Sequence, residues 1–166
     1  MPRPDAAAAA AAPSVDRHAS LGWREWVALP GLGIGAIKAK LDSGARSSSL
    51  HVEAIEAFHL DGIAHVRFHV RVRRRGNAIV VCTAPVLDRR SVTDSGGHRS
   101  ERWFIGVELE IACQRFSTEM NLTDRRAMLF PLLLGRSALA GRFHIDPASS
   151  YCCPRPPRTP TPRNHA

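Results

Sequence analysis

The chain has 166 residues, enough for one domain that buries its own core without the support of disulfides. Apolar residues make up 44% of it, and no apolar run reaches the length of a membrane-spanning helix, so we expect a cytoplasmic protein with no membrane partner. The formal net charge of +8 indicates an acidic partner. The four cysteines form no C-x-x-C pair, which favours reduced thiols.

The composition predicts one domain between two tails. Residues 1–20 are rich in Ala and Pro and lack a periodic apolar pattern, which is typical of a disordered segment. Their alanine tract is short and its flanking charges nearly cancel, so we do not expect a secretory signal. Residues 152–166 are rich in Pro and Arg and are interpreted as a loose tail. The predicted domain therefore covers residues 21–151.

The domain opens with two predicted strands. Residues 23–30 place alternate apolar side chains on one face and stop at Pro30. The glycine-rich residues 31–35 lack the G-x-G-x-x-G spacing of a nucleotide loop and open no helix, so we interpret them as a turn between strands. Residues 36–41 again alternate and lead into Asp42.

Two hairpins are predicted in the middle of the chain, where little favours helix. The first turns at residues 75–77, and the second follows the glycine pair at 96–97. The predicted arms are residues 65–73, 79–82, 103–111 and 116–122. Four arginines gather near the first turn, at positions 71, 73, 74 and 75. They form either a solvated hairpin end or a functional basic patch.

The last part of the domain is the most apolar. Residues 128–136 form a continuous apolar run that ends with a glycine and a charge, which predicts a strand buried on both faces. Ser137 is predicted to cap a short helix that reaches Leu139. Residues 142–147 are predicted to form a final short strand.

One carboxylate stands out chemically. In Asp42-Ser43-Gly44-Ala45 the acid follows a strand, and the glycine allows a sharp turn that brings backbone N–H groups close to it. The triplet Asp-Ser-Gly recurs at Asp94, where polar, glycine-rich surroundings favour an ordinary turn. We therefore take Asp42 as the candidate acid, with the small polar residues 46–51 lining a groove beside it.

The Asp42 turn and the later Leu-Leu-Leu-Gly-Arg sequence together resemble the retropepsin-like aspartic peptidases. The wider pattern resembles a bacterial subfamily labelled "ATP-dependent zinc protease" or RimK/LysX-associated. It comprises residues 23–26, 29–30, 38–46, 49–51, 122–125, 133–136 and 146–147. The resemblance covers residues 21 to about 151.

The resemblance implies an all-β fold, a closed retropepsin-like (acid protease) barrel with one short helix after Gly135-Arg136. It implies catalytic roles for Asp42, Ser43 and Gly44, substrate-binding roles for Ala45, Arg46, Ser47 and Ser48, and structural roles at the site for Leu134, Gly135 and Arg136. It also implies a flap hairpin, which either predicted hairpin can supply.

The chain departs from the family pattern at two positions. Ser43 stands where the subfamily usually has threonine, a change that keeps the hydroxyl group. Arg46 stands near the place where viral relatives carry an acid that pairs with the Gly-Arg arginine. Arg136 therefore needs another partner, for which we suggest Asp124.

Aspartic peptide hydrolysis needs two carboxylates, one ionised to activate water and one protonated to polarise the scissile carbonyl. The chain offers one convincing acid, so we expect a homodimer that pairs Asp42 with its copy. Relatives accompany ligases that add glutamates to proteins, which implies a peptide or protein substrate with an acidic, glutamate-extended tail. The alternative is a non-catalytic basic module that binds acidic peptide or nucleic acid, with peptide preferred.

No metal or other cofactor is expected. The chain contains no H-E-x-x-H motif and no Walker-type loop. His65 and His69 lie four apart on a predicted strand, where they share a face but are well separated. The zinc and ATP of the subfamily label therefore have no counterpart in the sequence.

Overall fold

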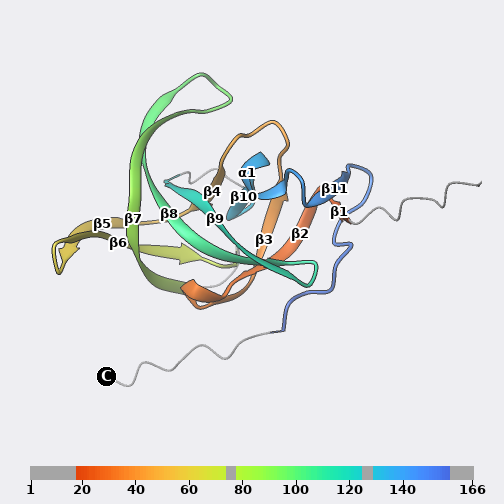
Figure 1. The fold of residues 1–166 in the computed structure, drawn as a ribbon, viewed down its shortest axis with the longest axis horizontal. Helices are drawn as coiled ribbons and strands as arrows, with labels where there is room; N and C mark the ends of the chain where they lie inside the picture. The colour runs from red at the N-terminus through yellow and green to blue at the C-terminus, as the bar shows by residue number, and fades with distance from the viewer. Residues whose placement is uncertain (1–17, 74–77, 125–128, 158–166) are drawn as a thin grey trace, which may run out of the picture.

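The computed structural model describes residues 18–73, 78–124 and 129–157 (Figure 1). The predicted turn at 75–77 and most of both predicted tails lie outside these residues. The described elements are β1 (Ala19–Gly22), β2 (Arg24–Leu29), η1 (Pro30–Leu32, a 3-10 turn), β3 (Ile34–Leu41), β4 (Ser48–His51), β5 (Ile55–Leu60), β6 (Ile63–Arg71), β7 (Ile79–Thr93), β8 (Arg99–Ile111), β9 (Gln114–Thr123), β10 (Leu132–Leu134), α1 (Arg136–Leu139) and β11 (Phe143–Asp146). No helix among them is long and apolar enough to cross a membrane.

The mostly-β architecture with one short helix is as predicted. Nine strands form one sheet in the order β2-β3-β10-β4-β9-β8-β7-β6-β5. A further pairing of Ala28 in β2 with Glu110 in β8 closes the first six of these strands into a ring of hydrogen-bonded pairs. The remaining strands, β7, β6 and β5, continue the sheet from β8, and β6 contributes buried Val66, Phe68 and Val70 to the same core (Figure 1).

The core forms where the alternating strands turn their apolar faces inward. In β3, Ile34, Ile37 and Ala39 are buried, whereas Lys38 and Lys40 are exposed, which is the pattern of a strand with one solvated face. The predicted turn before β3 is present, with Gly33 at φ 71°, a conformation that favours glycine. The alternation therefore fixes which side of β3 supports the strand end at Asp42.

The apolar run 128–136 is not one long strand, contrary to our prediction. Only Leu132–Leu134 form β10, because Pro131 has no N–H to donate to a ladder and Leu129 is 66% exposed. Ser137 is also not the helix cap, since α1 starts at Arg136 with Gly135 in the cap position. The predictions failed because apolarity alone does not show where strand pairing begins.

Strand β5 was not predicted. It is the edge strand of the sheet, pairs antiparallel with β6, and has mostly exposed side chains. Strand β7 is also longer than its predicted arm, because it continues past a bulge between Val86 and Asp88 to Thr93. Its length carries the β7–β8 hairpin well beyond the ring of strands (Figure 1).

One buried carboxylate links the two ends of the described chain. Glu25 is fully buried, and its side chain accepts hydrogen bonds from the backbone N–H groups of Gly22, Cys152 and Cys153 at 2.8, 2.8 and 3.3 Å. Strand β1 also pairs parallel with β11. The backbone on both sides of the predicted domain boundaries thus takes part in the folded structure, while the division into domain and tails stays a prediction.

We predict that Glu25→Ala destabilises the protein by about 2–4 kcal/mol, because it leaves three backbone donors without their acceptor. Urea denaturation measures the change. The matched control is Glu56→Ala, which removes an exposed carboxylate paired with Arg67 and should change stability by less than about 1 kcal/mol. Equal losses in the two variants would contradict the prediction.

Candidate active site

Asp42 directly follows β3, and its position is set by the pairing of β3 with β10. The two strands run parallel, with Leu41 opposite Leu134. The backbone N–H of Asp42 extends this ladder by donating to the carbonyl oxygen of Leu134 at 2.8 Å. The Asp42 side chain is 31% exposed and lies 4.0 Å from the Lys40 ammonium group. The acid is therefore fixed at its backbone and open at its carboxylate.

The turn after Asp42 orients that carboxylate. The N–H of Gly44 donates to Asp42 Oδ1 at 2.9 Å, and the N–H of Ala45 donates to the Asp42 carbonyl at 3.2 Å. This is the close approach of backbone N–H groups that the glycine in the sequence led us to expect. Oδ1 thus accepts a hydrogen bond within the turn, whereas Oδ2 lies 4.0 Å from the Lys40 ammonium group.

The Gly135-Arg136 segment packs against the same turn. The N–H groups of Arg136 and Ser137 donate to the carbonyls of Ala45 and Arg46 at 2.9 and 3.0 Å. Gly135 itself lies so close that an added Cβ would sit 2.6 Å from the carbonyl oxygen of Ser47. Only glycine therefore allows this approach between segments some ninety residues apart in sequence.

The guanidinium group of Arg136 is bound by the turn and not by Asp124, which corrects our suggestion. Its Nη1 donates to the carbonyls of Ser43 and Gly44 at 3.0 and 3.1 Å. The expected acidic partner is unnecessary because two carbonyl dipoles supply the negative potential. The Asp42 turn is therefore stabilised twice, by the Arg136 guanidinium group at the carbonyls of Ser43 and Gly44 and by β10 at the N–H of Asp42.

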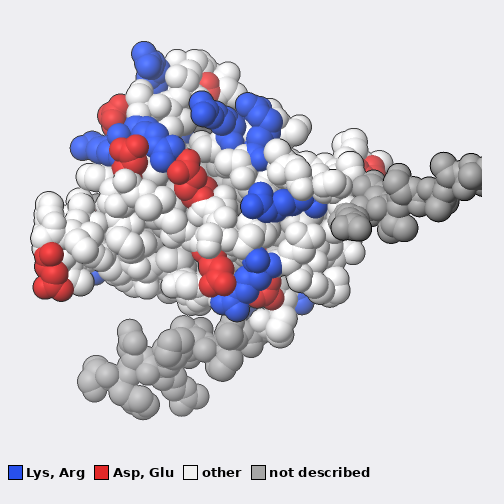
Figure 2. Space-filling view, in the orientation of Figure 1, with Lys and Arg blue, Asp and Glu red and all other residues white. Residues whose placement is uncertain are grey.

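A cavity of about 520 Å³ opens beside Asp42. The turn and the start of β4 form one wall, and residues 92–95 at the tip of the β7–β8 hairpin form another. Of the two hairpins that we considered as a flap, this one borders the Asp42 cavity, whereas the tip of the other lies outside the described residues. Lys and Arg side chains are frequent around this hairpin and the loop between β3 and β4 (Figure 2).

Asp94 forms a turn, as predicted, but it also lines this cavity. Its Oδ1 accepts hydrogen bonds from the N–H groups of Gly96 and His98 at 2.9 and 3.0 Å. Sequence reasoning identified the turn and missed the location, because the fold of a long hairpin back over the sheet leaves no local signal. Asp94 is thus a cavity-wall residue whose Oδ1 is committed to its own turn.

A buried polar network supports the wall of the cavity. Asn121 in β9 is fully buried, and its Oδ1 accepts from Ser49 Oγ at 3.0 Å and from Arg102 Nη1 at 3.1 Å. Its Nδ2 donates to the Ser48 carbonyl at 2.9 Å and to Ser47 Oγ at 3.3 Å. We did not predict Asn121 or Arg102, although a polar residue between Met120 and Leu122 was a possible signal.

The serines of the predicted groove therefore have different surroundings. Ser48 is buried, and its hydroxyl accepts the N–H of Gly135 at 3.1 Å, whereas Ser47 and Ser49 line the Asp42 cavity. The structure brings Asp42, Gly44, Ala45, Arg46 and Ser47 together around this cavity. Ser43 is exposed in the same turn.

A second, smaller cavity of about 430 Å³ adjoins the first at Arg46 and Ser47. Arg90 spans it with two hydrogen bonds to the Glu119 carboxylate, at 2.8 and 2.9 Å. These bonds hold the pKa of Glu119 below its ordinary value and raise the pKa of Arg90. The Glu119 carboxylate is thus bound by two short hydrogen bonds from a cation, whereas the nearest described cation in a salt bridge to Asp42, Lys40, lies 4.0 Å away.

Within residues 18–73, 78–124 and 129–157, no three His, Cys, Asp or Glu side chains are grouped so that they could hold a metal ion. His65 Nδ1 lies 2.9 Å from the carbonyl oxygen of Ile63 on the same strand, β6.

An acid on the turn after a strand, an apolar strand with Gly-Arg packed behind that turn, and a hairpin at its cavity define the retropepsin-like class of fold. The description "retropepsin-like aspartic endopeptidase RimB" belongs to the family model that matches residues 20–156. The chain belongs to this RimB-like family.

Similar proteins carry other names. The chain is 42% identical over 131 residues to a "probable alpha-L-glutamate ligase" of Desulfotalea psychrophila and 36% identical over 138 residues to one of Shewanella pealeana. The matches cover 77% and 82% of this chain but 28% and 30% of those relatives, so the chain spans less than a third of their length. A crystal structure of the protein Lpg0085 of Legionella pneumophila, whose title gives its function as unknown, superposes with a TM-score of 0.69 at 27% identity, covering 81% of this chain and 97% of that one.

We predict that Gly135→Ala destabilises the protein by about 1–3 kcal/mol through overpacking against the Ser47 backbone. The control is Gly106→Ala in β8, where an added Cβ meets only the Leu87 side chain, at an ordinary 3.6 Å. Thermal unfolding is measured for both variants. A Gly135→Ala protein with unchanged stability would contradict the geometry.

Proposed function

We propose that the protein is an aspartic endopeptidase in which Asp42 acts with Asp42 of the partner subunit in a homodimer. One observation carries the proposal: Asp42 presents an open carboxylate from a turn whose backbone is held by Leu134 and Arg136. Membership of the RimB-like family supports the class of reaction. The roles of Ser43 and Gly44 beside the acid follow from the same turn.

The need for a second subunit rests on the count of carboxylates. The described lining of the Asp42 cavity contains one other acid, Asp94, whose Oδ1 already accepts two backbone hydrogen bonds. A dyad that shares one proton requires two carboxylates in close contact. A two-fold axis beside the turn supplies this pair, because it places two identical surfaces face to face.

In this arrangement one Asp42 is ionised and takes a proton from the attacking water. The protonated Asp42 of the partner subunit donates a hydrogen bond to the scissile carbonyl oxygen as the carbon becomes tetrahedral. The C–N bond then breaks, the amine leaves with a proton from the dyad, and the new carboxyl group is released. Ser43 steadies the dyad by hydrogen bonds across the axis.

We further propose that the substrate is an acidic, glutamate-extended protein tail. Three arginines, Arg46, Arg102 and Arg136, line the Asp42 cavity. Arg136 is engaged with the turn and Arg102 with Asn121, so exposed Arg46 is the group best placed to bind substrate carboxylates. The relatives named as alpha-L-glutamate ligases support a glutamate-rich substrate.

We expect Asp42→Asn to lower cleavage of a fluorogenic glutamate-extended peptide by about 10²–10⁴-fold while stability stays unchanged, because a proton-transfer group is lost. A statine-type inhibitor should block the wild-type protein. Salt-sensitive binding of the peptide without inhibitor-sensitive cleavage would favour the alternative, a non-catalytic basic module.

Subunit mixing tests the dimer separately. With a fourfold excess of Asp42→Asn subunits exchanged into wild-type protein, about one fifth of the wild-type subunits pair with each other, so activity should fall to about that fraction. If each chain works alone, the inactive subunits change nothing. Undiminished activity after confirmed exchange therefore refutes the paired site.

We expect Arg46→Gln to raise KM for a glutamate-extended peptide about tenfold relative to a neutral peptide, since one charge-assisted hydrogen bond contributes roughly 1.5 kcal/mol. Arg89→Gln, which removes the same charge outside the described lining of the Asp42 cavity, is the control. Parallel changes for both peptides, or for both variants, would exclude a specific role for Arg46.

A further inference from the structure

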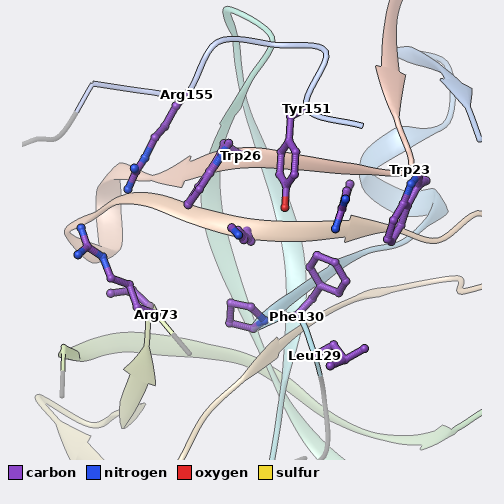
Figure 3. Close-up of a pocket in the computed structure, with 11 residues that line it drawn as sticks. Trp23, Trp26, Arg73, Leu129, Phe130, Tyr151 and Arg155 are labelled. Atoms are coloured by element: carbon purple, nitrogen blue, oxygen red, sulfur yellow. The ribbon is translucent and has the colours of Figure 1, made fainter. Parts of the chain in front are cut away.

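A third cavity, of about 620 Å³, lies in a different part of the fold, and none of its described lining residues lines the Asp42 cavity. Its size is in the range of pockets that hold ligands. Trp26, Tyr151 and Trp23 follow one another in this order along its upper wall, and Phe130 faces them from the opposite wall (Figure 3). Arg155 and Arg73 stand at its far end (Figure 3). We refer to it as the aromatic cavity.

The described lining of the aromatic cavity carries positive charge only. Among the residues that the structure describes, it includes four cations, Arg24, Lys38, Arg73 and Arg155, and no acidic residue. Within the part of the chain that the structure describes, none of these four forms a salt bridge, whereas Arg67, Arg71, Arg90 and Arg115 each pair with a carboxylate. Like charges gathered without counterions favour the binding of an anion.

The cations are held in place by the rings. Arg24 lies over Trp23 and Tyr151 at 4.6 and 5.0 Å from the ring centroids, and Arg155 lies 4.2 Å over Trp26. A guanidinium group stacked in this way keeps its in-plane N–H donors for another partner. The buried Nε of Arg24 makes no hydrogen bond within the described structure. The guanidinium groups are thus positioned before any ligand binds, and the Nε donor of Arg24 has no hydrogen-bond acceptor in the described structure.

The same stacking indicates which anion fits. Lys38 also lies over Trp26 and Tyr151, at 5.2 and 5.6 Å, so each of these two rings carries two cations. A nucleic-acid strand binds such aromatic rings by stacking its bases on their open faces. Carboxylates instead bind the free edges of guanidinium groups, often through two parallel hydrogen bonds. The cavity therefore favours an acidic peptide over a nucleic acid.

We propose that the aromatic cavity is a binding site for a carboxylate-rich peptide segment, separate from the Asp42 cavity. Its use as a place that holds the substrate tail during cleavage rests on the proposed function. The binding itself does not depend on it. A substrate bound at both cavities gains effective concentration at Asp42 without any new contact there.

The test uses the full chain carrying Asp42→Asn, so that binding is measured without cleavage. Fluorescence anisotropy follows a labelled oligo-glutamate peptide at low salt. In this background, Lys38→Gln with Arg155→Gln should weaken binding about tenfold or more. The matched control is Arg89→Gln with Arg142→Gln. It removes the same charge, and its two arginines also lie over aromatic rings, those of Trp103 and Phe116. It should change peptide binding less than about threefold. Should the first pair impair folding, the exposed pair Arg73→Gln and Arg155→Gln replaces it.

Equal weakening in the two double variants would reduce the effect to net charge and overturn the proposal. So would tighter binding of oligothymidylate than of the peptide at equal charge, which would identify a nucleic-acid site. Failure of the proposed function gives a different result. If the wild-type protein cleaves no peptide but the cavity variants still bind the peptide more weakly than the control variants, the peptidase proposal is wrong and the binding-site proposal stands. If the cavity variants change neither peptide binding nor cleavage, only the binding-site proposal is wrong.

Discussion

The parallel pairing of β10 with β3 is the contact on which the candidate active site depends. It is only three residues long, yet it ends where the N–H of Asp42 meets the Leu134 carbonyl and where Gly135 meets Ser47. A side chain at position 135 would collide with the Ser47 backbone. The Asp42 turn and β10 therefore fit together only in the observed register, with Leu41 opposite Leu134. The position of the acid is thus set by backbone geometry and not by its own side-chain contacts.

The second requirement is a satisfied polar layer under the cavity. Asn121 uses both ends of its amide group to hold the serines of β4 and the guanidinium of Arg102. Buried polar groups of this kind fix one arrangement when every member has a partner. The layer joins β4, β8 and β9, so the hairpin beside the cavity and the acid-bearing turn share one support.

Sequence patterns could predict the parts of the fold whose signal is local. Alternation predicted β3 and much of the hairpin arms, and the Asp-Ser-Gly sequence predicted the turn at Asp42, because these features depend on neighbouring residues. The extent of β10 could not be predicted, since Pro131 and exposed Leu129 interrupt an otherwise apolar run. Asp94 beside the cavity and Tyr151 beside Trp26 result from contacts between distant segments, for which one sequence offers no periodic signal.

The hydrogen bonds of Glu25 have a consequence for biosynthesis. They connect the segment that bears Tyr151 and Arg155 to the segment that bears Trp23 and Trp26, so the wall of the aromatic cavity joins residues made earlier with residues made later. A nascent chain that has emerged from the ribosome only as far as β9 contains Trp23 and Trp26 but not yet Tyr151 and Arg155, which lie beside them in the cavity. Both cavities are therefore completed only after residues 129–155 have been made.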